Sequence, residues 1–144
     1  MQSSITEIFV PRFVMKLERP LVLSRVPAGF PSPAEDYIEA RIDLNRDLIR
    51  HPFATFYVRV AGDSMETLIS DGELLVVDRM SETKDRDIVV ARVEDELCVK
   101  RLRILDDGSI WLFAENTSYQ PMAITPEMDF AIWGKVLHCI QSFK

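Results

Sequence analysis

From residue 55 onward, short apolar runs recur along the chain, and several of them alternate apolar with polar residues. Runs of about four to eight residues rich in β-branched and aromatic side chains are typical of β-strands. The predicted strands cover residues 55–60, 73–78, 87–93, 96–104, 109–114 and 129–140. Turn sequences such as SDGE, VEDE and DDGS separate several of these strands. The pattern predicts a mostly β fold, built as a compact and largely antiparallel domain.

The first 45 residues follow a different pattern. Five of the eight prolines lie within residues 1–33, and prolines at such spacing prevent long helices and favour extended chain. Residues 34–45, with the sequence AEDYIEARIDLN, predict a short helix at most. We therefore expect an extended, movable N-terminal arm over residues 1–45 and a β-rich domain over residues 46–144.

Charge is spread unevenly between these two parts. The chain of 144 residues carries a net charge of −6, which argues against binding of nucleic-acid phosphates over its whole surface. Residues 1–28 hold four basic and two acidic side chains, so they carry +2 and the rest of the chain carries −8. A basic arm on an acidic domain fits electrostatic docking, and it equally fits basic side chains that keep an apolar arm soluble.

Several classes of protein are not expected. No apolar run approaches the roughly 18 to 20 residues that span a bilayer, and the N-terminus lacks the order of a signal peptide. Cys98 and Cys139 lie in apolar strands, which predicts buried, reduced thiols in the cytoplasm rather than a disulfide. Cysteines and histidines lack the spacing of zinc ligands, and no phosphate-binding glycine loop is present. We expect no cofactor, no metal, no membrane attachment and no sequence-specific nucleic-acid binding.

Candidate chemistry centres on Ser64, in the sequence AGDSM, and on Lys100 in the predicted strand ELCVKRLRI. Strand alternation places Lys100 on one face with Cys98 and Leu102, where burial disfavours the ammonium and lowers the pKa of the lysine. A neutral lysine can take the proton of a serine hydroxyl, so Ser64 and Lys100 are the candidate nucleophile and base. The backbone amides of Ser64 and Met65, at the start of a short helical segment, are the candidate oxyanion donors. Without the lysine, AGDSM would indicate only an ordinary turn between strands.

The two histidines do not favour a Ser/His/Asp triad. His51 precedes Pro52 and is expected in a turn, and His138 lies in the last predicted strand. Neither has a spacing from Ser64 that suggests a third member of a catalytic site.

Longer sequence stretches carry a family resemblance. GDSM, ISDGELLVVD and VKRL, together with GFPSPAEDY at residues 29–37, RIDLN and HPFATFYVRV, resemble the LexA/UmuD family of self-cleaving serine peptidases. The resemblance runs from about Pro27 to Ile140, is most specific for the UmuD members, and implies a LexA-like peptidase domain with a Ser64/Lys100 dyad. METLISDG departs from those members: it is one residue shorter, lacks their glycines, and is similar in length to phage-repressor and signal-peptidase loops. The departure leaves the dyad intact and affects the rim of the cleft beside the serine.

The resemblance also implies a self-cleavage bond between Ala28 and Gly29. A small residue before glycine suits a narrow pocket, and the neighbouring prolines keep the segment extended, although PAGFPSP alone equally fits an unreactive loop. The chain is long enough for this bond to reach Ser64, because the 35 positions from Gly29 to Ser64 span on the order of 100 Å when extended.

Further implications concern partners. The resemblance to the UmuD members implies that cleavage is stimulated by the RecA filament on single-stranded DNA. It also implies a trimmed homodimer that serves a UmuC-like Y-family polymerase in error-prone translesion synthesis, within the SOS response. Alternatives are a LexA-like or phage-type repressor fragment, a signal-peptidase-like enzyme, and a non-catalytic polymerase-binding module. A repressor needs a helix-turn-helix that the first 50 or so residues do not show. The resemblance leaves open which polymerase is the partner, whether the gene is chromosomal or plasmid-borne, and whether cleavage occurs within or between subunits.

Overall fold

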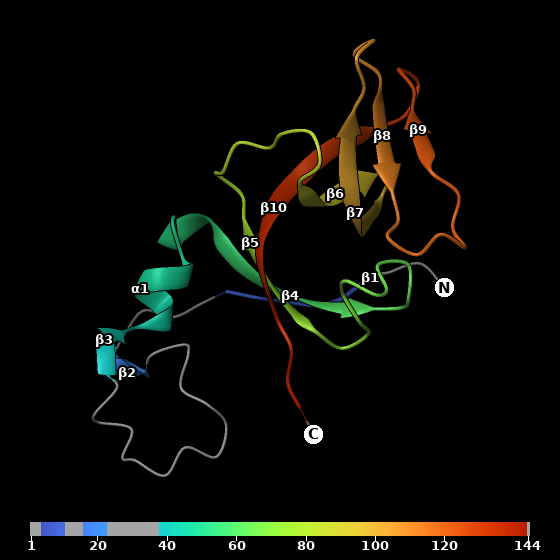
Figure 1. Ribbon diagram of the computed structural model, residues 1–144. Helices are drawn as coiled ribbons and strands as arrows, with labels where there is room; N and C mark the ends of the chain where they lie inside the picture. Colours follow the sequence, from blue (N-terminus) through green and yellow to red (C-terminus); the bar gives the residue numbers. More distant parts are fainter. Residues whose placement is uncertain (1–3, 11–15, 23–37, 144) are drawn as a thin grey trace.

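The structure is a computed structural model that describes residues 4–10, 16–22 and 38–143 (Figure 1). All the strands expected after residue 55 are present. They are β4 (Thr55–Ala61), β5 (Leu74–Asp78), β6 (Ile88–Val93), β7 (Glu96–Ile104), β8 (Ile110–Phe113) and β10 (Phe130–Ile140). The prediction of a mostly β, antiparallel fold is confirmed, because every strand pair in the described residues is antiparallel.

Four further strands lie where the sequence did not predict them: β1 (Ser4–Phe9), β2 (Arg19–Val22), β3 (Ile38–Ile42) and β9 (Met122–Ile124). Within residues 34–45, where we expected a short helix at most, residues 38–42 form β3, which pairs antiparallel with β2. Helix α1 (Leu44–Leu48) begins only after Asp43, whose Oδ1 accepts a hydrogen bond from the amide of Asn45 at 3.0 Å. An aspartate in this position caps a helix start and fixes where the strand ends.

The main sheet closes into a barrel. Among the described residues it has eight strands in the order β1-β4-β5-β10-β6-β7-β8-β9, and β1 also pairs with β7. In Figure 1 the long strand β10 crosses the middle of the molecule, between β5 and β6. Strands β8 and β9 continue the sheet beyond the point of closure.

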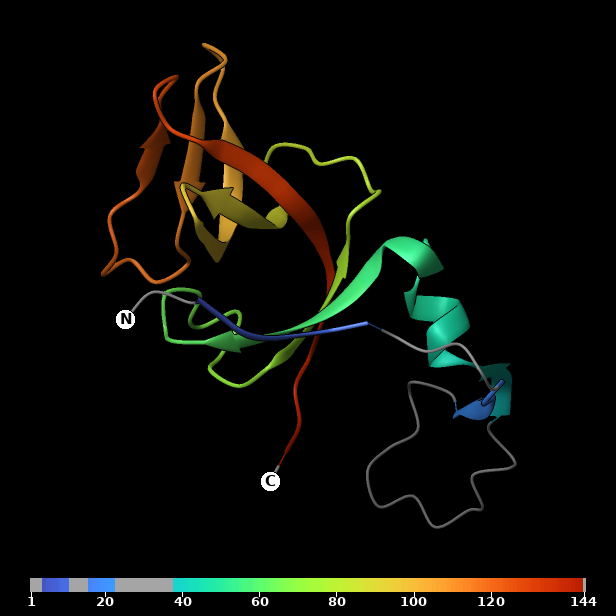
Figure 2. The ribbon, with the colours of Figure 1, turned by 180° about the vertical axis from the view of Figure 1, so that it is seen from behind.

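Strand β1 closes the barrel, because it pairs with both β4 and β7. It lies antiparallel to β4, from Ser4 opposite Ala61 to Phe9 opposite Tyr57, and Ser4 also lies opposite Cys98 of β7. Figure 2, the view from behind, shows β1 (blue) running alongside β4 (green). An exposed ion pair between Glu7 and Arg59, at 3.1 Å, accompanies the pairing of these strands. The division into an arm and a domain at residue 45 stays a prediction, and β1 within that region is a member of the barrel sheet.

The core divides into two clusters because both faces of β6 and β7 are covered. One cluster contains Val58, Val60, Met65, Ile69, Leu75, Val77, Val90 and Val99. The second contains Val89, Ala91, Leu102 and Leu112. Alternation along β6 therefore sends Val90 to the first cluster and its two neighbours to the second.

Truncation of the first cluster should destabilise the protein strongly. Leu75 is fully buried, so Leu75→Ala removes packed atoms and leaves a cavity. We expect the free energy of unfolding, measured by urea denaturation, to fall by about 2–5 kcal/mol. Leu44→Ala is the matched control, because Leu44 on α1 is 57% exposed and its loss should change stability by about 0.5 kcal/mol or less. Equal losses for the two variants would contradict the assignment of the core.

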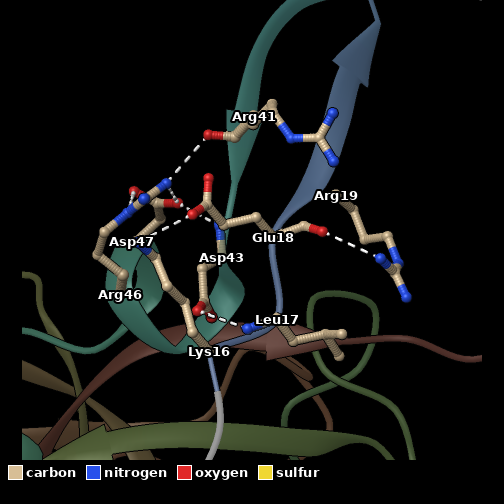
Figure 3. A network of polar contacts seen from close by, with 8 residues as sticks. All are labelled: Lys16, Leu17, Glu18, Arg19, Arg41, Asp43, Arg46 and Asp47. Carbon is tan, nitrogen blue, oxygen red and sulfur yellow. Dashed lines mark hydrogen bonds and ion pairs between the residues drawn. The ribbon is translucent and has the colours of Figure 1, made fainter.

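Strands β2 and β3 form a separate two-stranded antiparallel sheet beside α1 (Figure 1). Figure 3 shows the polar network at its base, where Asp43 Oδ2 accepts a hydrogen bond from the amide of Leu17 at 3.0 Å. The amide of Asp43 in turn donates to Asp47 Oδ2 at 2.9 Å. The hydrogen bond from Leu17 lowers the pKa of the Asp43 carboxyl below its usual value. These contacts attach the segment 16–22 to the segment 38–47.

The cysteine prediction is correct in one respect and wrong in another. Cys98 and Cys139 are both free thiols, as expected. Cys98 is only partly buried, however, and Cys139 is exposed near the end of β10, where it lies opposite Leu75 of β5. Partial burial and the nearby carboxylate of Glu73, 3.2 Å from its Sγ, raise the pKa of this thiol to about 12. Within the described residues, no helix has the length and apolar character needed to cross a membrane.

Candidate active site

Ser64 lies on a tight turn that follows β4; we call residues 62–69 the serine turn. Gly62 has a φ of 91°, a left-handed conformation that favours glycine, and its amide donates to Asp71 Oδ1 at 2.8 Å. The amide of Ile69 donates to the carbonyl of Met65 at 2.8 Å, and the Ser64 side chain is completely buried. The expected helical segment after Ser64 is instead a series of turns, because the described residues there make no successive helical hydrogen bonds.

Lys100 reaches the serine from the middle of β7. Its Nζ donates to Ser64 Oγ at 3.1 Å, and the lysine is only 4% exposed. As the alternation predicts, Cys98 and Leu102 pack in the second core cluster, whereas Val99 packs in the first. Burial lowers the pKa of Lys100 below its usual value, and the negative charge of an ionised Cys98 opposes that shift.

A second loop, residues 116–119, contacts both members of this pair. The amide of Asn116 donates to the Ser64 carbonyl at 2.9 Å, and its side chain donates to the Asp63 carbonyl at 3.1 Å. The Tyr119 hydroxyl donates to the Asp63 carboxylate, and the centre of its ring lies 5.6 Å from Lys100 Nζ. The contact with Tyr119 lowers the pKa of Asp63, and the same carboxylate raises the pKa of Tyr119 to about 12.

Sequence reasoning missed this loop, although a signal was present. The turn DDGS joins β7 to β8 and sets a register in which Arg101 lies opposite Phe113. The chain that follows Phe113 must therefore pass alongside Lys100 and the residues before it. The polar sequence ENTSYQP occupies that position and breaks the apolar pattern of the strand.

The geometry suits proton transfer from a hydroxyl. A serine oxygen lies within hydrogen-bond reach of an amine that is buried and more easily deprotonated than usual. In its neutral form such an amine accepts the hydroxyl proton as the oxygen attacks an electrophilic carbon.

The other candidate residues either lie away from Ser64 and Lys100 or have roles that the structure does not test. Ala28 and Gly29 fall outside the described residues, and the role of the Ser64 and Met65 amides as oxyanion donors stays a prediction. His51 pairs with the buried Asp78, with 2.6 Å between Nδ1 and Oδ2. This pair sits at the start of β4, whereas Ser64 follows its end, and seven strand residues span about 20 Å. His51 therefore does not form a triad with Ser64.

Known proteins are similar to this sequence over most of its length. The family model described as Peptidase S24-like matches residues 20–137. Protein ImpA of Salmonella typhimurium is 40% identical over 129 residues, which cover 85% of this chain and 83% of ImpA. Protein MucA of Escherichia coli is 40% identical over 123 residues, which cover 84% of this chain and 83% of MucA. The LexA repressor of Dechloromonas aromatica is 42% identical over 125 residues, which cover 85% of this chain and 61% of the repressor.

Proposed function

The chain belongs to the peptidase S24-like family, and from that membership we propose that it is a latent serine peptidase that cleaves its own backbone once, between Ala28 and Gly29. Ser64 is the nucleophile and Lys100 is the general base. The observation that carries the proposal is the 3.1 Å contact between Lys100 Nζ and Ser64 Oγ inside a buried site. Burial supports the role of the lysine, because it lowers the pKa of the group that must be neutral to accept a proton.

The proposed reaction proceeds through an acyl-enzyme. Neutral Lys100 takes the proton of Ser64 as Oγ bonds to the carbonyl carbon of Ala28, and the backbone amides of Ser64 and Met65 stabilise the resulting oxyanion. The bond to the Gly29 nitrogen then breaks, and that nitrogen takes the proton from the lysine. Water, deprotonated by the same lysine, hydrolyses the ester between Ser64 and Ala28, which frees the serine and leaves Ala28 as a new C-terminus.

Cleavage is the switch in the proposed biological role. The RecA filament on single-stranded DNA stimulates it in the SOS response, and the trimmed homodimer becomes an accessory subunit of a UmuC-like Y-family polymerase in translesion synthesis. The similarity to ImpA and MucA over most of the chain supports this role, as does the UmuD-like sequence GFPSPAEDY. The protein acts in the cytoplasm.

A repressor is the second candidate function, because the LexA repressor is 42% identical over 85% of this chain. The two functions differ in DNA binding. A gel-shift assay with duplex DNA fragments should show no sequence-specific complex if the protein serves a polymerase, and a discrete complex if it is a repressor.

Raising the pH should start cleavage without any partner. As the pH rises through the lowered folded pKa of Lys100, the neutral amine becomes the dominant form, so the cleavage rate should increase and then level off. The purified full chain is held between pH 7 and about pH 10, near the usual lysine value, and examined by intact mass measurement. The expected products are residues 1–28 and residues 29–144. Fragments from another bond would refute the proposed site, and an uncleaved, folded chain would favour the non-catalytic binding module.

A further inference from the structure

The loop 116–119 holds the two halves of the proposed dyad in one network. It reaches the serine turn through Asn116, which bonds to the carbonyls of both Asp63 and Ser64. Within the same loop, the amide of Tyr119 donates to the carbonyl of Asn116 at 3.1 Å, and the amide of Ser118 donates to Asn116 Oδ1 at 3.0 Å. These internal bonds make the loop a compact unit and fix where the Tyr119 side chain begins.

Tyr119 is the residue that contacts both sides of the site. Its hydroxyl is bonded to the Asp63 carboxylate, one residue before the nucleophile. Its ring faces the amino group of Lys100, with 5.6 Å between Nζ and the ring centre. We propose that Tyr119 is a positioning residue of the dyad: its ring shields the Lys100 amine, and its hydroxyl anchors the turn that carries Ser64. This inference rests on the proposed function and names a residue that the proposed chemistry does not itself require.

Two effects of the ring on Lys100 oppose each other. An aromatic face attracts an ammonium, which favours the charged form, but 5.6 Å is close to the outer limit of about 6 Å for that attraction. The ring also takes up space that water would fill, which favours the neutral amine. Burial is the larger effect at this lysine, because its pKa is lowered on balance. We assign part of this burial to the Tyr119 ring, which lies over the amine.

Among the described residues, Cys98 on the same strand is the titratable group that acts on the pKa of Lys100, and Asp63 lies on the serine turn, one residue before Ser64. The Cys98 sulfur favours the ammonium form through its negative charge when it is ionised. The carboxylate of Asp63 would do the same if it turned toward the amine, and its bond to the Tyr119 hydroxyl holds it in place. On β6, the residue paired with Lys100 is the buried Val89, which has no charge.

Two variants distinguish the two proposed roles of Tyr119, shielding of Lys100 and anchoring of the serine turn. Tyr119→Ala removes the ring and the hydroxyl, so the midpoint of the pH profile for self-cleavage should rise by about half a unit to one unit. Tyr119→Phe keeps the ring, so its midpoint should stay at the wild-type value. Its plateau rate should fall roughly fivefold to tenfold, because the serine turn loses one anchor. Tyr57→Phe is the matched control, since Tyr57 lies on β4 away from the dyad, and it should change neither quantity.

A measurement that does not depend on cleavage keeps this inference apart from the proposed function. In full chains that carry Ser64→Ala, the pKa of Lys100 is followed by NMR through the titration of its side-chain carbon next to Nζ. The pKa should rise when Tyr119→Ala is added and stay unchanged with Tyr119→Phe. A wild-type chain that never cleaves would refute the proposed function alone. An unchanged Lys100 pKa in the alanine variant would overturn the shielding role, and a wild-type plateau rate for the phenylalanine variant would overturn the anchoring role.

Discussion

Replacing Ser64 with alanine is expected to abolish self-cleavage and leave the protein folded, and replacing Lys100 with arginine is expected to do the same. Nucleophile and base act as one unit, so the loss of either should slow the reaction roughly a thousandfold or more. Lys100→Arg is the sharper test, because a guanidinium stays protonated and cannot accept the proton of the serine. The rate is measured by intact mass during alkaline incubation, and circular dichroism checks that each variant remains folded.

Matched controls use the same substitutions elsewhere on the chain. Ser142→Ala and Lys84→Arg change exposed residues, and His138→Ala tests the histidine of the last strand. All three should cleave at the wild-type rate. Comparable cleavage by Lys100→Arg and the wild type would show that Lys100 is not the base.

Loss of the Asp78 carboxylate should have the largest effect on stability among the polar residues. Asp78 is completely buried at the end of β5, and its oxygens accept from His51 at 2.6 Å and from the amides of Met80 and Ser81 at 2.7 and 3.1 Å. Asp78→Ala leaves these donors without their acceptor, so we expect the free energy of unfolding to fall by about 3 kcal/mol. Urea denaturation of the variant and of Asp106→Ala, an exposed aspartate in a turn, gives the comparison. Equal stabilities would contradict the proposed importance of this carboxylate.

The same carboxylate gives a stability change with a defined sign in acid. Burial alone would raise the pKa of Asp78, but the hydrogen bonds from His51, Met80 and Ser81 together outweigh it, so the folded pKa is lowered. Its stabilising contribution should be fully present above about pH 4, the usual value in an unfolded chain. That contribution should be lost as the pH falls through the lowered folded pKa. Asp78→Ala should remove this part of the acid dependence, which pH-dependent urea curves measure.

Strands whose own apolar side chains line the core were predictable from the sequence. The apolar runs of β5, β6 and β7 match the observed strands within one residue, because the core they line requires buried side chains at those positions. The same alternation placed Lys100 among apolar neighbours. Burial of the lysine therefore follows from local sequence, although its distance from Ser64 does not.

Elements that depend on a partner far along the chain were not predictable. The short strand β3 is determined by its pairing with β2, and its sequence IEARI fits a helix nearly as well. The three residues of β9 are too few to show a period. The contacts of Tyr119 depend on the register between β7 and β8 and on the path of the loop after them, and neither is a property of the tyrosine itself.

Because β1 is a strand of the barrel, cleavage of the arm and dissociation of the cleaved fragment are two separate events. A cut at Ala28–Gly29 falls in the connection between β2 and β3, so the fragment 1–28 keeps β1 paired with β4 and β7, and β2 paired with β3. Before the cut, the tether holds these strands at an effective concentration on the order of millimolar. After it, the fragment is a ligand with a dissociation rate, and dilution decides how much stays bound. The edges of β4 and β7 would then be exposed at the rate at which β1 dissociates from them. A cleaved protein in which β1 is still paired would be a distinct intermediate.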